Sequence, residues 1–102
     1  MLPKIILVRP QLGENIGAAA RAMWNCGFRD LRLVSPRDGR PGTAALSTAA
    51  SGARPIVKNA EIYESVADAV SDLHLVFATT ARNRDIAKTF MDIDQALSLI
   101  HI

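Results

Sequence analysis

Guanidinium and amide side chains follow the first apolar run of the chain. Arg9 comes directly after Ile5–Val8, and Asn15 and Arg21 lie in the segment beyond it. Guanidinium groups bind phosphate oxygens and stabilise developing negative charge, and the free N–H groups at the start of a helix attract anions. Asn15 is a good N-cap, so a helix beginning there would place these side chains near its positive end. The pattern indicates a site for an anionic or polar ligand, although a simple cap and a solvated arginine would produce it too.

A second polar cluster follows the apolar run His74–Ala78. It consists of Thr79-Thr80-Ala81, with Arg82 and Arg84 after it. Open α/β sheets hold their ligands at the carboxyl ends of the strands. These hydroxyl and guanidinium groups therefore form a second candidate ligand site.

The first cluster is positioned by a predicted strand, helix and strand. Ile5–Val8 is apolar without alternation, which predicts a strand buried on both faces of a parallel sheet, and Pro10 ends it. The helix should end at Gly27, which favours a left-handed cap, and the next strand starts at Leu31. Arg21 lies outside the apolar arc of the helix. The arc that we expect to face the sheet consists of Ile16, Ala19, Ala20, Met23 and Gly27.

The rest of the chain continues the alternation of helices and strands. Turn-forming residues predict a loop over 36–42, followed by an alanine-rich helix over Thr43–Ser51 that Gly52 closes. Short apolar elements are predicted at Ile56-Val57 and at Ile62-Tyr63. A helix over Ser65–Leu73, a buried parallel strand over His74–Ala78 and a helix start at Asp92 complete the predicted α/β pattern.

Composition and charge narrow the class of protein. The 102 residues are 49% hydrophobic and 22% charged, which is typical of one small globular domain. No apolar run is long enough for a membrane span, no signal-peptide layout is present and Cys26 is the single cysteine, so a cytoplasmic protein is expected. Residues 1–58 carry nine Lys or Arg against three acids, and residues 59–102 carry three against seven. The basic half indicates a phosphate-binding face, although ordinary surface charge would account for it equally well.

The string PQLGENIGAAARAMWNCGFRDLRLVSPRDG resembles the first signature motif of the SpoU/TrmH-type SPOUT RNA methyltransferases, in particular their TrmJ-like tRNA/rRNA branch. The family pattern of asparagine, glycine and arginine falls on Asn15, Gly17 and Arg21. The likeness continues through Ala50–Ala53 and Ala78–Arg82, and it spans roughly Ile5 to Asp85.

The resemblance implies an α/β fold of the α/β-knot (SPOUT) type, a three-layer parallel sheet. Family members continue beyond this length through two further motifs that form the knot. Residues 1–102 are therefore expected to be the N-terminal portion of the domain, truncated before the knot and inactive alone, with an end over about 92–102 that need not be native. The cofactor implied is S-adenosyl-L-methionine, bordered by Thr79, Thr80 and Ala81.

The implied reaction is methyl transfer to a ribose 2′-hydroxyl of tRNA or rRNA in a homodimer, with neither a membrane nor a metal. Arg21 would clamp a phosphate and stabilise the developing alkoxide, and Asn15 would orient Arg21 or the ribose. The RNA surface would consist of Arg9, Glu14, Arg37, Arg40, Arg82 and Arg84.

Two other hypotheses remain. A non-catalytic RNA-binding α/β module would use the basic half of the chain as its phosphate platform. An unrelated doubly wound nucleotide-binding domain has less support, because the sequence has neither a G-x-G-x-x-G turn nor a P-loop.

Overall fold

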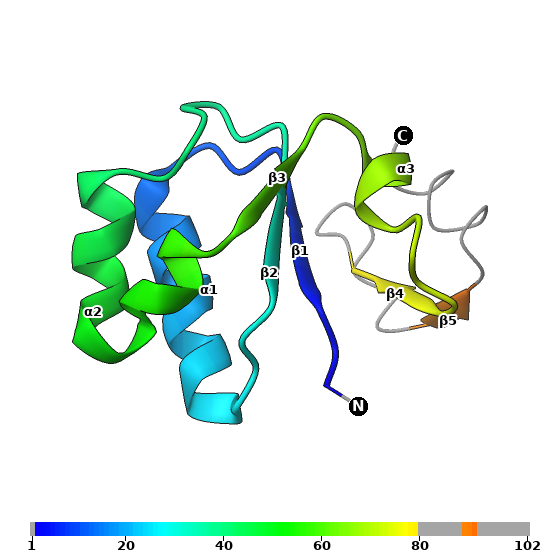
Figure 1. The fold of residues 1–102 in the computed structure, drawn as a ribbon, viewed down its shortest axis with the longest axis horizontal. Helices are drawn as coiled ribbons and strands as arrows, with labels where there is room; N and C mark the ends of the chain where they lie inside the picture. The colour runs from blue at the N-terminus through cyan, green and yellow to red at the C-terminus, as the bar shows by residue number, and fades with distance from the viewer. Residues whose placement is uncertain (1, 80–88, 92–102) are drawn as a thin grey trace. The chain divides into compact units, whose positions relative to one another are not determined.

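The structure is a computed structural model that describes residues 2–79 and 89–91 (Figure 1). The chain divides into two compact units, Met1–Ser65 and Val66–Ile102.

The first unit is a parallel α/β unit. Its elements in chain order are β1 (Ile5–Val8), α1 (Gly13–Cys26), β2 (Leu31–Val34), α2 (Thr43–Lys58) and β3 (Glu61–Tyr63). The strand order is β1-β2-β3 with both pairings parallel, and Val34 is the register partner of Val8 on one side and of Tyr63 on the other. Both helices cover the same face of the sheet (Figure 1). The predicted parallel α/β class is confirmed.

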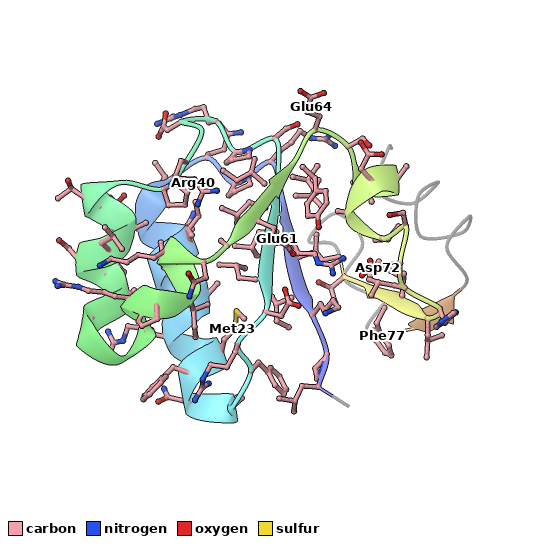
Figure 2. The ribbon with its side chains drawn as sticks, viewed as in Figure 1. Met23, Arg40, Glu61, Glu64, Asp72 and Phe77 are labelled. Atoms are coloured by element: carbon pink, nitrogen blue, oxygen red, sulfur yellow. The ribbon has the colours of Figure 1, made fainter. Side chains whose placement is uncertain are left out.

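The core of this unit lies between the sheet and the two helices. Leu31 and Leu33 of β2 are at most 2% exposed, and Met23 points from α1 toward the strands (Figure 2). Ile16 and Ala20 are also buried, which confirms the sheet-facing arc at these positions, and Gly27 ends α1 with the predicted left-handed φ of 83°. The core cluster consists of Ile16, Ala20, Met23, Leu31, Leu33, Ala45, Ala49, Ala53, Ile56, Val57 and Ala60.

The strand β1 differs from its prediction. All four of its residues are half-buried, whereas all four residues of β2 are buried. Among the described residues, β1 is an edge strand of this sheet and β2 is its central strand, and an apolar run without alternation does not determine how completely each face is covered.

The contact between α1 and α2 is close because Gly17 has no side chain. A Cβ atom at Gly17 would lie 2.5 Å from the carbonyl oxygen of Ala45 and 2.8 Å from the backbone nitrogen of Ala49. Gly17 falls outside the predicted sheet-facing arc, and it is nevertheless buried, because α1 buries a second face against α2. The predicted helix had only one buried face.

The helical run of α2 extends past its predicted end. Gly52 does not close the helix, which continues to Lys58 with a kink at Ala50 (φ 64°, ψ 176°). The Nε of Arg54 donates to the carbonyl oxygen of Leu46 across this kink, at 3.3 Å. The predicted separate element at Ile56-Val57 is wrong, because these residues form the buried last turn of α2.

The second unit departs most from the prediction. The helix predicted over Ser65–Leu73 is only α3 (Val66–Ala69), which ends in short-range bonds from Ser71 to Asp68 and from Leu73 to Val70. The strand predicted over His74–Ala78 is β4 (Val76–Ala78), and it pairs antiparallel with β5 (Thr89–Met91). The predictions of a parallel and fully buried strand are therefore wrong, since Phe77 is 43% exposed. The predicted helix start at Asp92 lies outside the described residues.

Substitution of Gly17 by valine should destabilise the first unit by about 3 kcal/mol, because the added side chain must push α1 and α2 apart. Urea denaturation gives the free energy of unfolding. The matched control is Ala18→Val on the exposed side of α1, where we expect a loss below about 1 kcal/mol. Equal losses in the two variants would contradict close packing at Gly17.

Substitution of Ala50 by glycine should stabilise the chain by about 1 kcal/mol. The backbone conformation of Ala50 is one that essentially only glycine adopts without strain, and relief of the strain should exceed the entropic cost of glycine. Thermal and urea denaturation measure the change. The control Ala22→Gly, at an exposed and regular position of α1, should lose about 1 kcal/mol. A similar loss at Ala50 would mean that this residue is helical.

Candidate functional site

The first unit has two strained residues at neighbouring strand ends. Arg9 follows β1 with a φ of 51°, and Ser35 follows β2 with a φ of 44°. Each stands directly before a proline, which restricts its backbone further. Left-handed residues other than glycine cost about 1–3 kcal/mol each and cluster at functional sites. The carboxyl edge of this sheet is therefore the candidate site of the unit.

Hydrogen bonds hold both strand exits in place. The N–H of Arg9 donates to the carbonyl of Val34 at 2.7 Å, and the N–H of Ser35 donates to the carbonyl of Tyr63 at 2.9 Å. The hydroxyl of Ser35 also donates to the carbonyl of Glu64, at 2.8 Å. The parallel hydrogen-bonding pattern thus continues one residue beyond each strand, and both loops begin at the same edge of the sheet.

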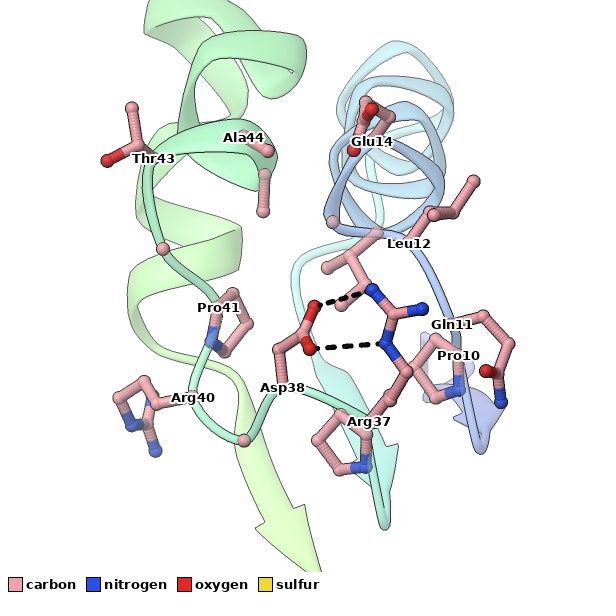
Figure 3. A pocket seen from close by; sticks show the side chains of 16 residues that line it. Pro10, Gln11, Leu12, Glu14, Arg37, Asp38, Arg40, Pro41, Thr43 and Ala44 are labelled. Carbon is pink, nitrogen blue, oxygen red and sulfur yellow. Dashed lines mark hydrogen bonds and ion pairs between the residues drawn. The ribbon is translucent and has the colours of Figure 1, made fainter.

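A cavity of about 290 Å³ lies beside these exits (Figure 3). Its walls come from the β1–α1 connection, the loop between β2 and α2, and the first turns of both helices. The N–H of Arg37 donates to the carbonyl of Pro10 at 3.1 Å and joins the two loops. The lining residues are Pro10–Glu14, Ile16 and Pro36–Ala45.

An ion pair lies in this cavity. The Nε of Arg37 lies 3.2 Å from Oδ1 of Asp38, and its Nη2 lies 3.3 Å from Oδ2 (Figure 3). The hydrogen bond to Asp38 and the charge of that carboxylate raise the pKa of Arg37, and the charge of Glu14 adds to the increase. Arg37 and Glu14, two predicted RNA-binding residues, are thereby brought to the same cavity.

Arg40 belongs to the same loop but points away from the ion pair (Figure 3). Its Nη1 donates to the carbonyl of Ala60 at 3.2 Å and approaches that of Lys58 at 3.5 Å. A cation at the end of a helix satisfies exposed carbonyl groups and complements the negative end of the dipole. Arg40 therefore has a structural role at the end of α2, and its predicted RNA contact stays a prediction.

The prediction that Asn15 caps the helix is wrong. The N-cap of α1 is Leu12, which makes no side-chain cap hydrogen bond, and Asn15 lies in the first turn with its N–H on the carbonyl of Leu12 at 3.1 Å. The extended backbone of Leu12 lets the helix begin at Gly13.

Asn15 and Arg21 are both exposed, and the helix directs them differently. Six residues correspond to about 240° around the axis and about 9 Å along it. Within one chain, α1 therefore does not bring these two predicted catalytic residues together. Arg21 lies away from the sheet-facing arc, as expected.

The other predicted site residues belong to the second unit. Thr79 is exposed and comes directly after β4. The predictions for Thr80, Ala81, Arg82 and Arg84 lie outside the described residues.

Ser35 and Arg32 were not among the predicted site residues. The repeated pattern Val8-Arg9-Pro10 and Val34-Ser35-Pro36 was the sequence signal that β1 and β2 end in the same way. Arg32, only 4% exposed, lies 3.8 Å from Asp30 and 3.6 Å from Glu61. The sequence signal for Arg32 was a charged residue inside an otherwise apolar strand. Arg32 belongs to a structural ion network.

Residues 2–79 and 89–91 contain neither a metal-binding cluster nor a membrane-spanning helix. No group of three or more His, Cys, Asp or Glu side chains there is arranged to hold a metal ion. No helix in the same residues has the length and apolar character needed to cross a membrane.

Known proteins share this architecture. The chain matches the SpoU rRNA Methylase family over residues 3–100. The crystal structure of TrmJ from Z. mobilis ZM4 superposes with a TM-score of 0.76 at 57% identity, covering 82% of this chain and 37% of that one. A Haemophilus influenzae protein described as an uncharacterized tRNA/rRNA methyltransferase is 42% identical over 89 residues, which are 87% of this chain and 36% of that protein.

A third relative has a defined activity in its name. The tRNA (cytidine-2′-O-)-methyltransferase TrmJ of Methanocaldococcus jannaschii is 39% identical over 82 residues, which are 79% of this chain and 35% of that protein. The fold is thus that of the SPOUT class of α/β proteins. The chain belongs to the SpoU rRNA Methylase family, and it spans about a third of the length of the curated relatives that it matches.

Substitution of Arg40 by alanine should lower the free energy of unfolding by about 1 kcal/mol, because two carbonyl groups at the end of α2 lose a charged donor. Urea denaturation measures the loss. The control Arg37→Ala removes the same charge from the same loop, but from an exposed pair, and should change stability little. If Arg37→Ala proved the more destabilising, Arg40 would not be the capping residue.

Proposed function

We propose that this chain is part of an S-adenosyl-L-methionine-dependent RNA ribose 2′-O-methyltransferase that acts on tRNA or rRNA. Family membership supports this reaction, as does the activity named for the Methanocaldococcus jannaschii relative. The observation that carries the proposal is the orientation of α1. Two faces of this helix are buried, against the sheet and against α2, while Arg21 of the family motif stays exposed.

Arg21 would act on the ribose and its phosphate. A guanidinium offers five N–H donors in a fixed plane and stays protonated, so it suits a phosphate clamp and not a proton acceptor. The same charge stabilises the negative charge that develops on the 2′-oxygen as it attacks. The proton would pass to a neighbouring RNA phosphate or to water. Asn15 leaves α1 in another direction, so within one chain it would orient the ribose and not Arg21.

The cofactor would supply an activated methyl group. Thr79, Thr80 and Ala81 are the residues proposed to lie beside it. The exposed position of Thr79 after β4 fits this role, because a hydroxyl at a strand end can hydrogen-bond a polar ligand.

The RNA surface would consist of the basic side chains of both units. In the first unit these are Arg9, Arg37 and Arg40, with Glu14 tethering an arginine, and in the second unit Arg82 and Arg84. Arg9 is exposed at a strained strand exit, which supports a ligand contact there.

We also infer a cytoplasmic homodimer in which Arg21 serves the partner's cofactor pocket. The exposed Ala18 and Ala22 on α1 would allow the close approach of a second chain. The second candidate function is a non-catalytic RNA-binding module. The charge of +6 on residues 1–58 favours it, because that charge supports RNA binding without any chemistry.

A hybrid protein tests the reaction. This chain replaces the matching third of the Methanocaldococcus jannaschii relative, and 2′-O-methylcytidine formed in tRNA is measured. We expect an active hybrid. Arg21→Ala should lower its turnover at least about a hundredfold, with the circular dichroism spectrum and cofactor affinity unchanged, and Arg21→Lys should restore only part of it.

The matched control is Arg29→Ala, which removes an arginine that lies over the ring of Trp24. This variant should stay active. A folded, cofactor-binding but inactive hybrid would favour the non-catalytic module. Near-normal turnover in Arg21→Ala would refute only the proposed role of Arg21 and not the reaction.

A further inference from the structure

Resting on the proposed function, we propose that the cavity beside β1 and β2 binds an unstacked nucleobase of the RNA. The Arg37–Asp38 pair would hydrogen-bond the edge of the base, and the proline and leucine side chains would contact its faces. Single-stranded RNA is commonly recognised by bases that leave the stack and are bound by their edges and faces. The site would thus recognise a base near the methylated ribose.

The charge around the cavity favours a neutral ligand over a phosphate. Arg37 contributes one positive charge, Asp38 and Glu14 contribute two negative charges, and the guanidinium of Arg40 points away (Figure 3). The starts of α1 and α2 each add about half a positive charge. The sum is about zero, so a phosphate would gain little there, whereas a nucleobase carries no charge to be balanced.

The walls and the size of the cavity suit a flat ring. Pro10, Pro36 and Pro41 contribute rigid apolar surfaces, and Leu12 and Ile16 add to them. The volume of about 290 Å³ lies at the lower end of the range for small-molecule pockets. A single base fits within such a volume.

The ion pair leaves donors and acceptors side by side. Arg37 uses Nε and Nη2 on Asp38, so Nη1 and the second hydrogen of Nη2 are available within the guanidinium plane. Each oxygen of Asp38 accepts one of these bonds and can accept another. Nucleobase edges likewise present donors beside acceptors: arginine binds them through two hydrogen bonds, and aspartate accepts from the amino group of cytosine.

The experiment separates base from phosphate. Backbone amides of the 102-residue chain are followed by two-dimensional 15N NMR during titration with uncharged nucleosides (cytidine, uridine, adenosine) or with ribose 5-phosphate. We expect at least one nucleoside to shift the amides of Leu12, Gly13, Gly39 and Gly42 in a saturable way, and ribose 5-phosphate to leave them unchanged.

Substitution Asp38→Asn should weaken nucleoside binding about fivefold, the equivalent of one hydrogen bond. Glu64→Gln is the matched control: it removes the same charge from a side chain that points outward away from the cavity (Figure 2), and should leave binding unchanged. An equal effect of both variants would show that only net charge matters, and would overturn the proposal.

Shifts with ribose 5-phosphate alone, or equal shifts with both ligand types, would identify a phosphate or ribose site and overturn the base pocket. No shift with any nucleoside would overturn it too. The methylation of tRNA by the hybrid is measured separately. If the hybrid is active and no nucleoside shifts the cavity amides, only the base pocket is refuted. If the hybrid is inactive and nucleosides shift these amides, only the methyl transfer is refuted.

Discussion

The parallel pairing of β1 with β2 is the interaction on which the candidate site depends. With Val8 opposite Val34, both strands end at the same level, and the bond from Arg9 to Val34 extends the ladder into the loops. A register shift of one residue would turn the side chains of β1 to the other face and separate the two exits. The cavity and its ion pair therefore follow from the sheet register, and the loops only complete them.

The second constraint is the burial of α1 on two faces. Its apolar arc fixes it to the sheet, and Gly17 fixes it to α2, so rotation about its axis is prevented from both sides. A helix held in this way presents one remaining face to solvent, with Arg21 on it. Small residues at the α1–α2 contact also bring the two helix starts close enough to form opposite walls of one cavity.

Much of the first unit could be predicted from the sequence, because its signals are local. The apolar run of β1, the glycine that ends α1 and the turn residues of the 36–42 loop each determine their own structure. The errors arose where tertiary contacts decide. Gly52 did not end α2 because the kink at Ala50 allows the helix to resume, and His74–Ala78 gave no indication of its antiparallel partner. Arg21 and Arg37 were predicted as site residues from the sequence, but the neighbouring strand ends at Arg9 and Ser35 were not, since they require the register of two strands.

The cationic side chains of residues 1–58 fall into two groups, those with a partner in the structure and those without one. Most of these cations have a partner in the structure. They are Lys4 with Asp30, Arg29 with Trp24, Arg32 with Glu61, Arg37 with Asp38, Arg40 with Ala60 and Arg54 with Leu46. Arg9, Arg21 and Lys58, in contrast, have no side-chain partner among residues 2–79 and 89–91. Since a guanidinium already engaged by a carboxylate or carbonyl has less to gain from a phosphate, Arg9 and Arg21 are the arginines of this unit that would be available for the backbone of the proposed RNA.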